Sequence, residues 1–546
     1  MADIDLAPTA DAIAMPAPAR ARLPGQIAYI IGNEGCERFS FYGMRNILTQ
    51  FLVSSSLLFT ATEVISQTER EGAAKDVFHT FVLGVYFFPL LGGWLADRFL
   101  GKYRTILYLS LIYCAGHACL ALFEANKAGF FTGLILIALG SGGIKPCVSA
   151  FVGDQFDQSN KSLAKVVFDA FYWIINFGSF FATLLMPLFL RHYGASVAFG
   201  IPGLLMFIAT LIFWFGRGQY VRVPPSPPQA DSFLRVTRSA LLSRGPHGNR
   251  PGLVLAGIGA VVASALVVLG FVDLGRLLIH HAPLLGVAQS WCLALVAAIA
   301  FVGGGAWWQL ERARGAHPDE AVDGARSVLR ILVLFFLVTP FWSLFDQKAS
   351  TWVLQANAMT KPSWFEPSQM QALNPLLVML LIPLNNLVLY PALRLVGFEP
   401  TALRRMGAGI ALSGLSWVVV GVMQMALDDS QPLSIVWQVL PYALLTLGEV
   451  LVSATGLEFA YSQAPATMKG AIMAFWSLSV TVGNLWVLLV NAAVRNDAVT
   501  QAIAQSGLGV MSFQMFFFAA FAFLAALAFG LYAARYTLVD HYRKAE

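Results

Sequence analysis

Charged residues are scarce in this chain. Of its 546 residues only 12% are Asp, Glu, Lys or Arg, whereas soluble proteins carry about 25%. Apolar residues reach 57%, against about 45–50% in soluble proteins. This composition excludes a soluble globular enzyme and a disordered protein. The net charge of +5 is small for a chain of this length, so no basic surplus exists to pair with a polyanion, and a nucleic-acid-binding protein is excluded as well.

Cysteine is also scarce, with five residues in the chain. All five lie in apolar runs, which favours small buried side chains over a disulfide framework. Cys114, His117 and Cys119 have a spacing similar to that of metal ligands. They fall on different faces of one predicted helix, however, so we expect neither a metal nor another cofactor.

Long apolar runs are abundant instead. A helix that spans a bilayer needs about 20 apolar residues, and we count about fourteen such runs. Their approximate cores are 27–53, 79–98, 104–124, 129–152, 164–189, 197–216, 252–272, 285–308, 327–346, 371–396, 404–426, 434–462, 468–493 and 511–536. The predicted fold class is therefore an all-α membrane protein with fourteen transmembrane helices, and the lipid bilayer is its first expected partner.

Basic residues in the loops predict the orientation. Arg98, Lys102 and Arg104 lie in one short loop, and six arginines lie between residues 217 and 250. If the spans alternate, all of them fall on one side, which is then cytoplasmic together with both termini. The long basic loop also divides the chain. The simplest partition is a disordered tail (1–24), an N-terminal six-helix bundle (25–216), a cytoplasmic linker (217–251), an inserted helix pair (252–310) and a C-terminal six-helix bundle (311–540).

The first span carries polar groups where lipid is expected. At 100° per residue, six side chains fall within an arc of about 140°: Glu34, Glu37, Arg38, Phe41, Tyr42 and Arg45. Each ionisable side chain inside a membrane costs about 3 kcal/mol or more. This face must therefore line a wet cavity or pair with other helices. A structural ion-pair network and a pathway for substrate and protons are both compatible with it.

Other spans supply groups that match this face. They are His79 and Tyr86 in the second span, Lys145 in the fourth, Asp346 at the end of the ninth, and Glu449 with Ser453 one turn later in the twelfth. The topology places Arg45, His79 and Asp346 at similar depth near the outer surface. We expect these three to close the outer side, and Lys145 with Glu449 to help close the inner side. Protonating a carboxylate removes the penalty for breaking such a buried pair, which couples protons to opening.

Several motifs together resemble a known family. The run Glu34-x-x-Glu37-Arg38-Phe39-x-x-Tyr42-Gly43 resembles the first-helix motif of the proton-dependent oligopeptide transporters of the major facilitator superfamily. Further runs that resemble this family are 92–105, 142–156, 171–179, 341–347, 373–375 and 447–465. The resemblance implies two six-helix bundles that rock about a central site, with an added helix pair at 252–308. It also implies inward symport of di- and tripeptides with protons, across a bacterial inner membrane. We expect a monomer.

The resemblance also implies roles for single residues. Arg45, Lys145 and Tyr42 would meet the peptide carboxylate, and Glu449 its ammonium, helped by Asn176 and Asn374. Tyr86, Trp342 and Trp476 would line the pocket, and Ser453 shares the face of Glu449. Glu34, Glu37 and Arg38 would form the proton-coupling cluster, with His79 and Asp346 at the outer gate.

Some residues depart from the family pattern. Phe41 stands where many bacterial members have a second tyrosine, and Lys348 adds a cation near Asp346. Substrate preference is therefore open. The alternative is a carrier of the same fold for another solute, such as nitrate or a peptide-like conjugate, although Glu449 argues against a simple anion. A peptide sensor without turnover is a second alternative. A membrane-embedded enzyme is a third, but the chain has neither HExxH nor a Ser-His-Asp order.

Overall fold

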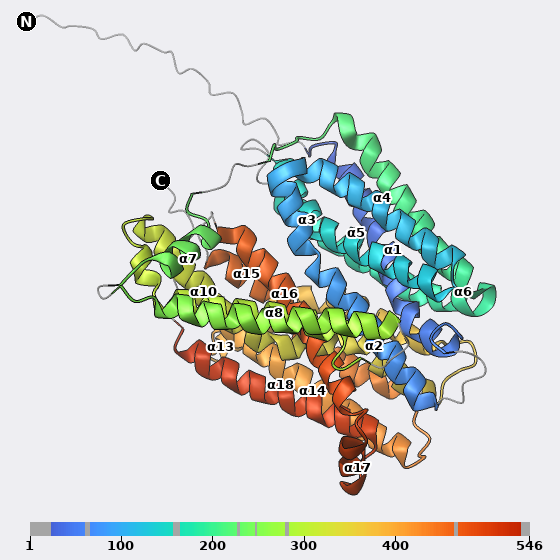
Figure 1. Cartoon of the computed structure of the whole chain (residues 1–546). Coiled ribbons are helices and arrows are strands. Elements are labelled where there is room, and N and C mark those ends of the chain that lie inside the picture. The colour runs from blue at the N-terminus through green and yellow to red at the C-terminus, as the bar shows by residue number, and fades with distance from the viewer. Residues whose placement is uncertain are drawn as a thin grey trace, which may run out of the picture.

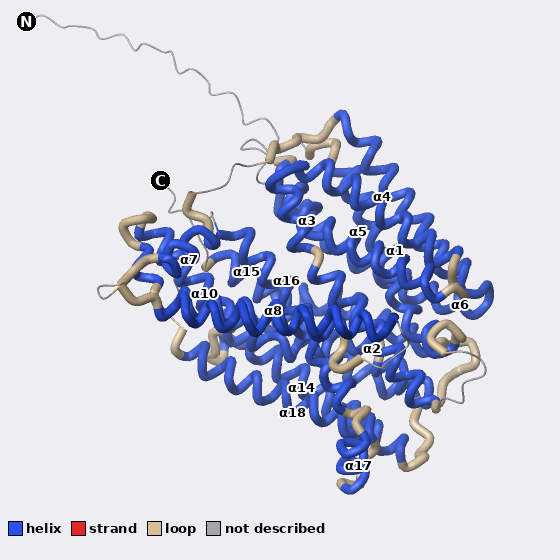
Figure 2. Tube along the Cα trace, viewed as in Figure 1, coloured by secondary structure: helices blue, strands red, loops and turns tan. Residues whose placement is uncertain are grey.

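The computed structural model describes residues 23–59, 66–156, 164–225, 230–245, 248–278, 283–463 and 468–536 (Figure 1). Within these ranges every regular element is a helix (Figure 2). The long helices of the first half are α1 (Ile27–Ser54), α2 (Gln67–Phe87), α4 (Gly101–Leu122), α5 (Lys127–Asp154) and α6 (Ala164–Phe215). Almost all of the predicted tail, 1–24, lies outside the described residues.

The second half begins after a linker that contains α7 (Phe233–Leu242). A helical hairpin of α8 (Pro251–Leu278) and α9 (Val287–Trp308) follows. The remaining long helices are α10 (Asp319–Asp346), α12 (Leu373–Leu384), α14 (Ala402–Asp428), α15 (Val439–Ser462), α16 (Lys469–Ala493) and α18 (Val510–Ala534). Shorter helices are α3 (Pro89–Leu95), α11 (Thr351–Ala358), α13 (Tyr390–Leu395) and α17 (Asp497–Gln505).

The helices agree with fourteen crossings. Eleven helical segments of the described chain are long and apolar enough to span a membrane. Two of them, Gln67–Leu122 with 56 residues and Ala170–Gly218 with 49 residues, are too long for one crossing at about 1.5 Å per residue. The chain turns back within each, at Gly101 (φ 74°) and at Gly194 (φ 82°), where only glycine adopts a positive φ without strain. The segment α1 crosses as well, although its charges keep it out of the apolar set.

Each half has a hydrophobic core of its own. One cluster of buried side chains comes mainly from residues 27 to 220, with Ala349 and Leu354 of the second half added, and it includes the edge-on pair Phe51 and Phe199, whose ring centroids are 5.2 Å apart. The other cluster runs from Phe233 to Phe529 and includes the edge-on pair Trp352 and Tyr442, whose ring centroids are 4.9 Å apart. The structure is thus two bundles, which converge near α2 in Figure 1. The predicted limits of the two bundles, 25–216 and 311–540, stay a prediction.

The helix α2 begins twelve residues earlier than the span predicted at 79–98. Its start is a capping box: the amide of Glu69 donates to Ser66 Oγ (3.3 Å), and the amide of Ser66 donates to Glu69 Oε2 (2.8 Å). These bonds satisfy free backbone donors at the helix start. The helix that contains His79 therefore starts well before the predicted apolar span, because the charged segment before His79 is helical too.

The linker between the two halves contains a packed helix. Its helix α7 buries Phe233, Val236 and Ala240, and the side-chain amide of Gln309 donates to the carbonyl of Ala240 at 2.7 Å. An amphipathic pattern within the basic loop thus forms a helix that packs under the second half.

The hairpin of α8 and α9 lies across the second half, with α8 on the near face in Figure 1. The two helices pack closely at Gly252 and Gly305, where an added Cβ on Gly252 would lie 2.2 Å from the carbonyl oxygen of Gly305. Val254, Val261 and Val268, spaced by seven residues, form an exposed apolar stripe on α8. This stripe is suited to contact with lipid.

Candidate functional site

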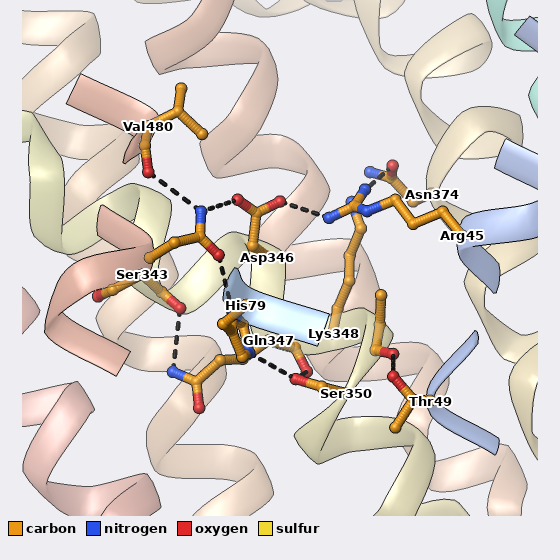
Figure 3. A network of polar contacts seen from close by, with 12 residues as sticks. Arg45, Thr49, His79, Ser343, Asp346, Gln347, Lys348, Ser350, Asn374 and Val480 are labelled. Atoms are coloured by element: carbon orange, nitrogen blue, oxygen red, sulfur yellow. Dashed lines mark hydrogen bonds and ion pairs between the residues drawn. The ribbon is translucent and has the colours of Figure 1, made fainter. Parts of the chain in front are cut away.

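The two halves are joined by an ion pair between Arg45 and Asp346, near the end predicted to face outward. Arg45 Nη2, on α1, lies 2.5 Å from Asp346 Oδ1, on α10, and both side chains are buried. The other carboxylate oxygen accepts a hydrogen bond from Asn484 Nδ2 of α16, at 2.7 Å. Figure 3 shows this cluster. The predicted proximity of Arg45 and Asp346 is therefore present, while its role as a gate stays a prediction.

His79 reaches Asp346 through Asn484 rather than directly. His79 Nδ1 lies 2.7 Å from Asn484 Oδ1, and Nε2 lies 2.9 Å from Ser350 Oγ (Figure 3). Because an amide oxygen only accepts, Nδ1 carries a proton, and in the neutral ring Nε2 accepts from the Ser350 hydroxyl. A continuous hydrogen-bonded chain thus runs from His79 through Asn484 and Asp346 to Arg45.

Further contacts between the halves lie at the same end. The Thr49 hydroxyl donates to the carbonyl of Ala349 at 2.9 Å, and Gln371 donates to Asn46. Arg191 pairs with Glu366 at 2.9 Å. Among the described residues, every hydrogen bond or ion pair between the two bundles lies outward of, or at, Leu83, one turn inward from His79. The polar contacts that join the two bundles within the described ranges therefore gather at the end predicted to face outward.

Two carboxylates and a guanidinium form a buried cluster on α1. Arg38 Nε lies 2.9 Å from Glu34 Oε1 and 2.5 Å from Glu37 Oε2. All three side chains are buried. Neither oxygen of Glu37 has a hydrogen-bond partner among the described residues. The three groups predicted to couple protons are thus brought together, and the Glu37 carboxylate is held mainly by charge.

Lys145 faces aromatic rings rather than a carboxylate. Its Nζ lies 4.3 Å from the centre of the Phe41 ring and 4.4 Å from that of Tyr86. A cation over an aromatic face is stabilised by the ring quadrupole. Phe41, which departs from the family pattern, thus contributes a cation–π contact, and Tyr42 packs edge-on against it at 5.4 Å.

The side-chain amide of Asn374 binds both Glu449 and Lys348. Asn374 Nδ2 donates to Glu449 Oε2 at 2.6 Å and to Thr446 Oγ1 at 3.1 Å. The oxygen of the same amide accepts from Lys348 Nζ at 2.7 Å. The expected ion pair between Lys145 and Glu449 is absent from the contacts of the described residues. The two groups belong to different bundles, and the polar contacts between the described parts of these bundles lie at the end predicted to face outward.

Aromatic side chains form one wall on the second half. The rings of Trp342 and Trp476 lie edge-on with centroids 5.7 Å apart, and Phe345 lies 5.9 Å from Trp342. On the first half, Asn176 donates to the carbonyl of Tyr172 within its own helix, at 3.0 Å. Ser453 is half-buried. The structure thus gives Asn176 a local partner rather than one across the two bundles.

Sequence reasoning missed two sets of polar residues. Asn484 is central to the outer cluster, and its only signal is an amide within an otherwise apolar helix. Tyr113, Ser40 and His117 form the second set, next to Glu37. Ser40 Oγ lies 2.9 Å from His117 Nε2, and the rings of Tyr113 and His117 stack at 5.0 Å. All three are fully buried. Within the described ranges no group of His, Cys, Asp and Glu side chains has the arrangement of a metal site.

Comparisons with known proteins identify the family of this chain. A model of the POT family matches residues 103–268 and 294–507. Solute carrier family 15 member 2 of Rattus norvegicus is 33% identical over 418 residues, which cover 73% of this chain and 49% of that protein. Peptide transporter 3 of Caenorhabditis elegans is 31% identical over 427 residues, which cover 74% and 52%. The chain spans about half the length of the curated relatives it matches.

Solved structures are similar over nearly the whole chain. An auto-inhibited POT family peptide transporter is 65% identical, with a TM-score of 0.90, and the match covers 96% of this chain and 99% of that one. The POT family transporter PepTSo is 64% identical, also with a TM-score of 0.90, over 95% and 100%. These matches confirm the predicted fold of two helical bundles in the major facilitator superfamily. The chain belongs to the POT family, as its motifs predict.

Proposed function

We propose that this protein imports di- and tripeptides together with protons by alternating access. The observation that carries the proposal is the division of charge between the halves: Arg45 and Lys145 belong to the first bundle and Glu449 to the second. The names of the relatives support it, since several of them are peptide transporters.

A short peptide has the charge pattern that such a cavity recognises. It is a zwitterion whose carboxylate suits the cations of the first half and whose ammonium suits Glu449. A peptide bound at both poles spans the plane along which the bundles rock. Its side chains need only room between the poles, so selectivity among peptides is broad. A free amino acid is too short to reach both.

Protons act on the buried carboxylates. Protonating Asp346 removes the counter-ion of Arg45 and weakens the outer contact. The cluster of Glu34, Glu37 and Arg38 is a second place where a proton changes the balance of buried charge. Each positive charge that enters gains about 2.3 kcal/mol per 100 mV of membrane potential. One proton therefore suffices to drive uptake against a gradient.

Reconstitution of the full chain into proteoliposomes tests the proposal. With an inward pH gradient, we expect labelled dipeptide to accumulate above its external concentration, and a protonophore to abolish the accumulation. Binding without accumulation indicates a sensor instead. Competition with unlabelled dipeptide, nitrate and a peptide conjugate separates the alternative substrates. Accumulation of labelled nitrate without accumulation of labelled dipeptide contradicts the assignment of Glu449.

We also propose a bacterial inner membrane as the location, a monomeric state and cytoplasmic termini. Orientation is tested by single cysteines in a cysteine-free background, labelled with a membrane-impermeant reagent in intact cells. Asp429, after α14, should react from outside, and Gly397, before it, should not. The reverse pattern contradicts the orientation.

A further inference from the structure

The linker helix α7 carries apolar residues on two faces. Its inner face, which begins with Phe233, is buried against the second half. The outer face carries Leu234 and Leu242, which are 75% and 45% exposed, with the exposed side chain of Arg238 between them. Because these three residues are spaced by four positions, they form one stripe along the helix. The two leucines of this stripe are left outside the core of the second half.

The outer face of α7 is also basic. At 100° per residue, the exposed Arg235 falls within about 100° of the other members of the stripe. Among the described residues no hydrogen bond, ion pair or ring contact reaches the guanidinium of Arg235 or of Arg238. The acidic residue closest to them in the sequence, Asp231, pairs with His317 at 2.8 Å. The face therefore combines arginines that lack an acidic partner with exposed leucines, and this chemistry suits an anionic lipid surface.

Contacts at the end of α7 place this helix at the level of the lipid headgroups. The side-chain amide of Gln309 donates to the carbonyls of Ala240 and Leu241, at 2.7 and 2.8 Å. Gln309 directly follows Trp307 and Trp308, the last two residues of α9, which are 47% and 65% exposed. Exposed tryptophan is typical of the boundary between acyl chains and headgroups, so α9 ends at this boundary. The last turn of α7 is fixed at the same level.

The chain on either side of α7 lies near the same surface. The spanning helix α8 begins at Pro251, nine residues after α7 ends at Leu242. Before α7, Arg217 lies 3.7 Å from the centre of the Trp214 ring, at the end of α6, and a cation over tryptophan is typical of the headgroup level. The helix α7 itself lies beside α10 at this end of the second half (Figure 1). The linker is thus held close to the membrane at both ends.

We propose that α7 binds the anionic lipid surface of the cytoplasmic leaflet through this outer face. Its arginines meet the lipid phosphates, because a guanidinium binds phosphate through paired donors. Its leucines reach the boundary of the acyl chains below them. The position at headgroup level favours lipid over a soluble partner. The side of the membrane rests on the orientation proposed above, whereas the contact with lipid rests on α7 alone.

The contact with lipid gives the second bundle a fixed point. Ser239 Oγ of α7 lies 2.8 Å from Nε2 of His317, two residues before α10 begins. Phe233 of α7 packs edge-on against Phe475 of α16, with ring centroids 5.8 Å apart. The helices α10 and α16 both carry residues of the outer cluster. A lipid-bound α7 therefore holds the starts of the two helices whose later residues contact the first bundle.

Spin labels on the full chain in nanodiscs test the contact. Leu234→Cys and Leu242→Cys, each in a cysteine-free background, carry the label, and its relaxation by oxygen, which enters lipid, is compared with that by a water-soluble nickel chelate. In phosphatidylcholine discs that contain phosphatidylglycerol, we expect oxygen to dominate at both labels, and high salt to reverse this, because salt screens exposed charge. Glu320→Cys, at an exposed residue of α10, is the control and should stay in water. Both faces of a disc have the same lipids, so the result depends neither on orientation nor on transport.

Charge variants separate the arginines from the leucines. Arg235→Gln and Arg238→Gln should each lower the ratio of lipid-contacting to water-exposed label about fivefold, the value of one cation near an anionic surface. Arg394→Gln, which removes an exposed arginine that pairs with Glu399, should leave the ratio unchanged. Thermal unfolding midpoints check that each variant is folded. Labels that stay in water in both kinds of disc overturn the contact, and lipid contact that is equal without phosphatidylglycerol and insensitive to both arginine variants overturns the anionic surface.

Discussion

Arg45 of α1 and Asp346 of α10 form a buried ion pair between the two bundles, with Nη2 and Oδ1 2.5 Å apart. Their side chains are only 8% and 2% exposed, so water screens the pair little. An arginine stays charged at any physiological pH. The contact can therefore be switched only at the carboxylate, where Asn484 and, through it, His79 hold the other oxygen.

Replacing Asp346 by Asn should open the outer end. Loss of one partner from a buried pair costs about 3–5 kcal/mol, because the Arg45 charge is left without a counter-ion. Spin labels at Tyr193 and Trp437, exposed residues near the outer ends of the two halves, report the separation by double electron–electron resonance. We expect a longer distance component in the variant.

The control for this experiment is Asp428→Asn, at the outer end of α14. Asp428 accepts from Gln424 of its own helix at 2.9 Å and makes no contact across the halves, so the distances should stay as they are. A distance distribution in Asp346→Asn identical to that of the unchanged protein would show that the pair does not hold the outer end closed.

Glu34→Gln and Glu37→Gln should separate proton coupling from peptide movement. Each variant removes one carboxylate next to Arg38 while the cavity keeps its shape. Accumulation under a pH gradient should fall to the equilibrium level, whereas counterflow exchange of labelled for unlabelled peptide should persist. Equal loss of both activities argues for a structural ion-pair network, the other interpretation of this face of α1.

Tyr113 should position the Glu37 carboxylate. Its hydroxyl is fully buried close to Glu37, Ser40 and Ser141, and it makes no hydrogen bond of normal geometry among the described residues. Tyr113→Phe removes only the hydroxyl, so we expect the pH profile of uptake to move while peptide affinity in exchange stays the same. Tyr103→Phe is the control on the same helix, since that ring stacks on Phe213 instead. An unchanged pH profile in Tyr113→Phe excludes the positioning role.

The fold was largely predictable because apolar length is a strong signal. Spans over 20 residues long mark membrane helices whatever their partners. The start of α2 was not predictable, because its first three turns are polar and their start depends on one capping box at Ser66. The turn at Gly194 was predicted as a break between two spans, and the structure joins them through a single residue with positive φ.

The residues of the site were predictable where a charged side chain interrupts an apolar run. Glu34, Arg45 and Asp346 stand out because lipid cannot solvate them. The links between them were not predictable, since Asn484 and Asn374 carry no charge. An amide in a transmembrane helix has many uses, and only the fold shows that each of these two bridges charged or ionisable side chains.

Ser66→Ala should loosen the start of α2. The side chain of Ser66 accepts from the Glu69 amide, and loss of such a cap raises local opening about fivefold. Hydrogen exchange of the amides at 67–70 should accelerate accordingly. The control is Ser232→Ala, because Ser232 caps α7 by position but makes no side-chain bond there. Equal acceleration at both helices contradicts the capping role.

Lys348 should set the affinity for peptides by competing for Glu449. Its Nζ and the Glu449 carboxylate bind the same amide, Asn374, so a peptide ammonium that approaches Glu449 also meets the like charge of Lys348. Such a pair costs a few kcal/mol at the dielectric of a protein surface. Lys348→Gln keeps a donor for Asn374 and removes the charge, and it should lower KM for uncharged dipeptides roughly tenfold. Glu449→Gln should raise KM instead. Lys361→Gln, which removes a lysine bonded only to backbone carbonyls, is the control. A KM that is unchanged or higher in Lys348→Gln contradicts the competition, because the cation would then assist rather than oppose the bound ammonium.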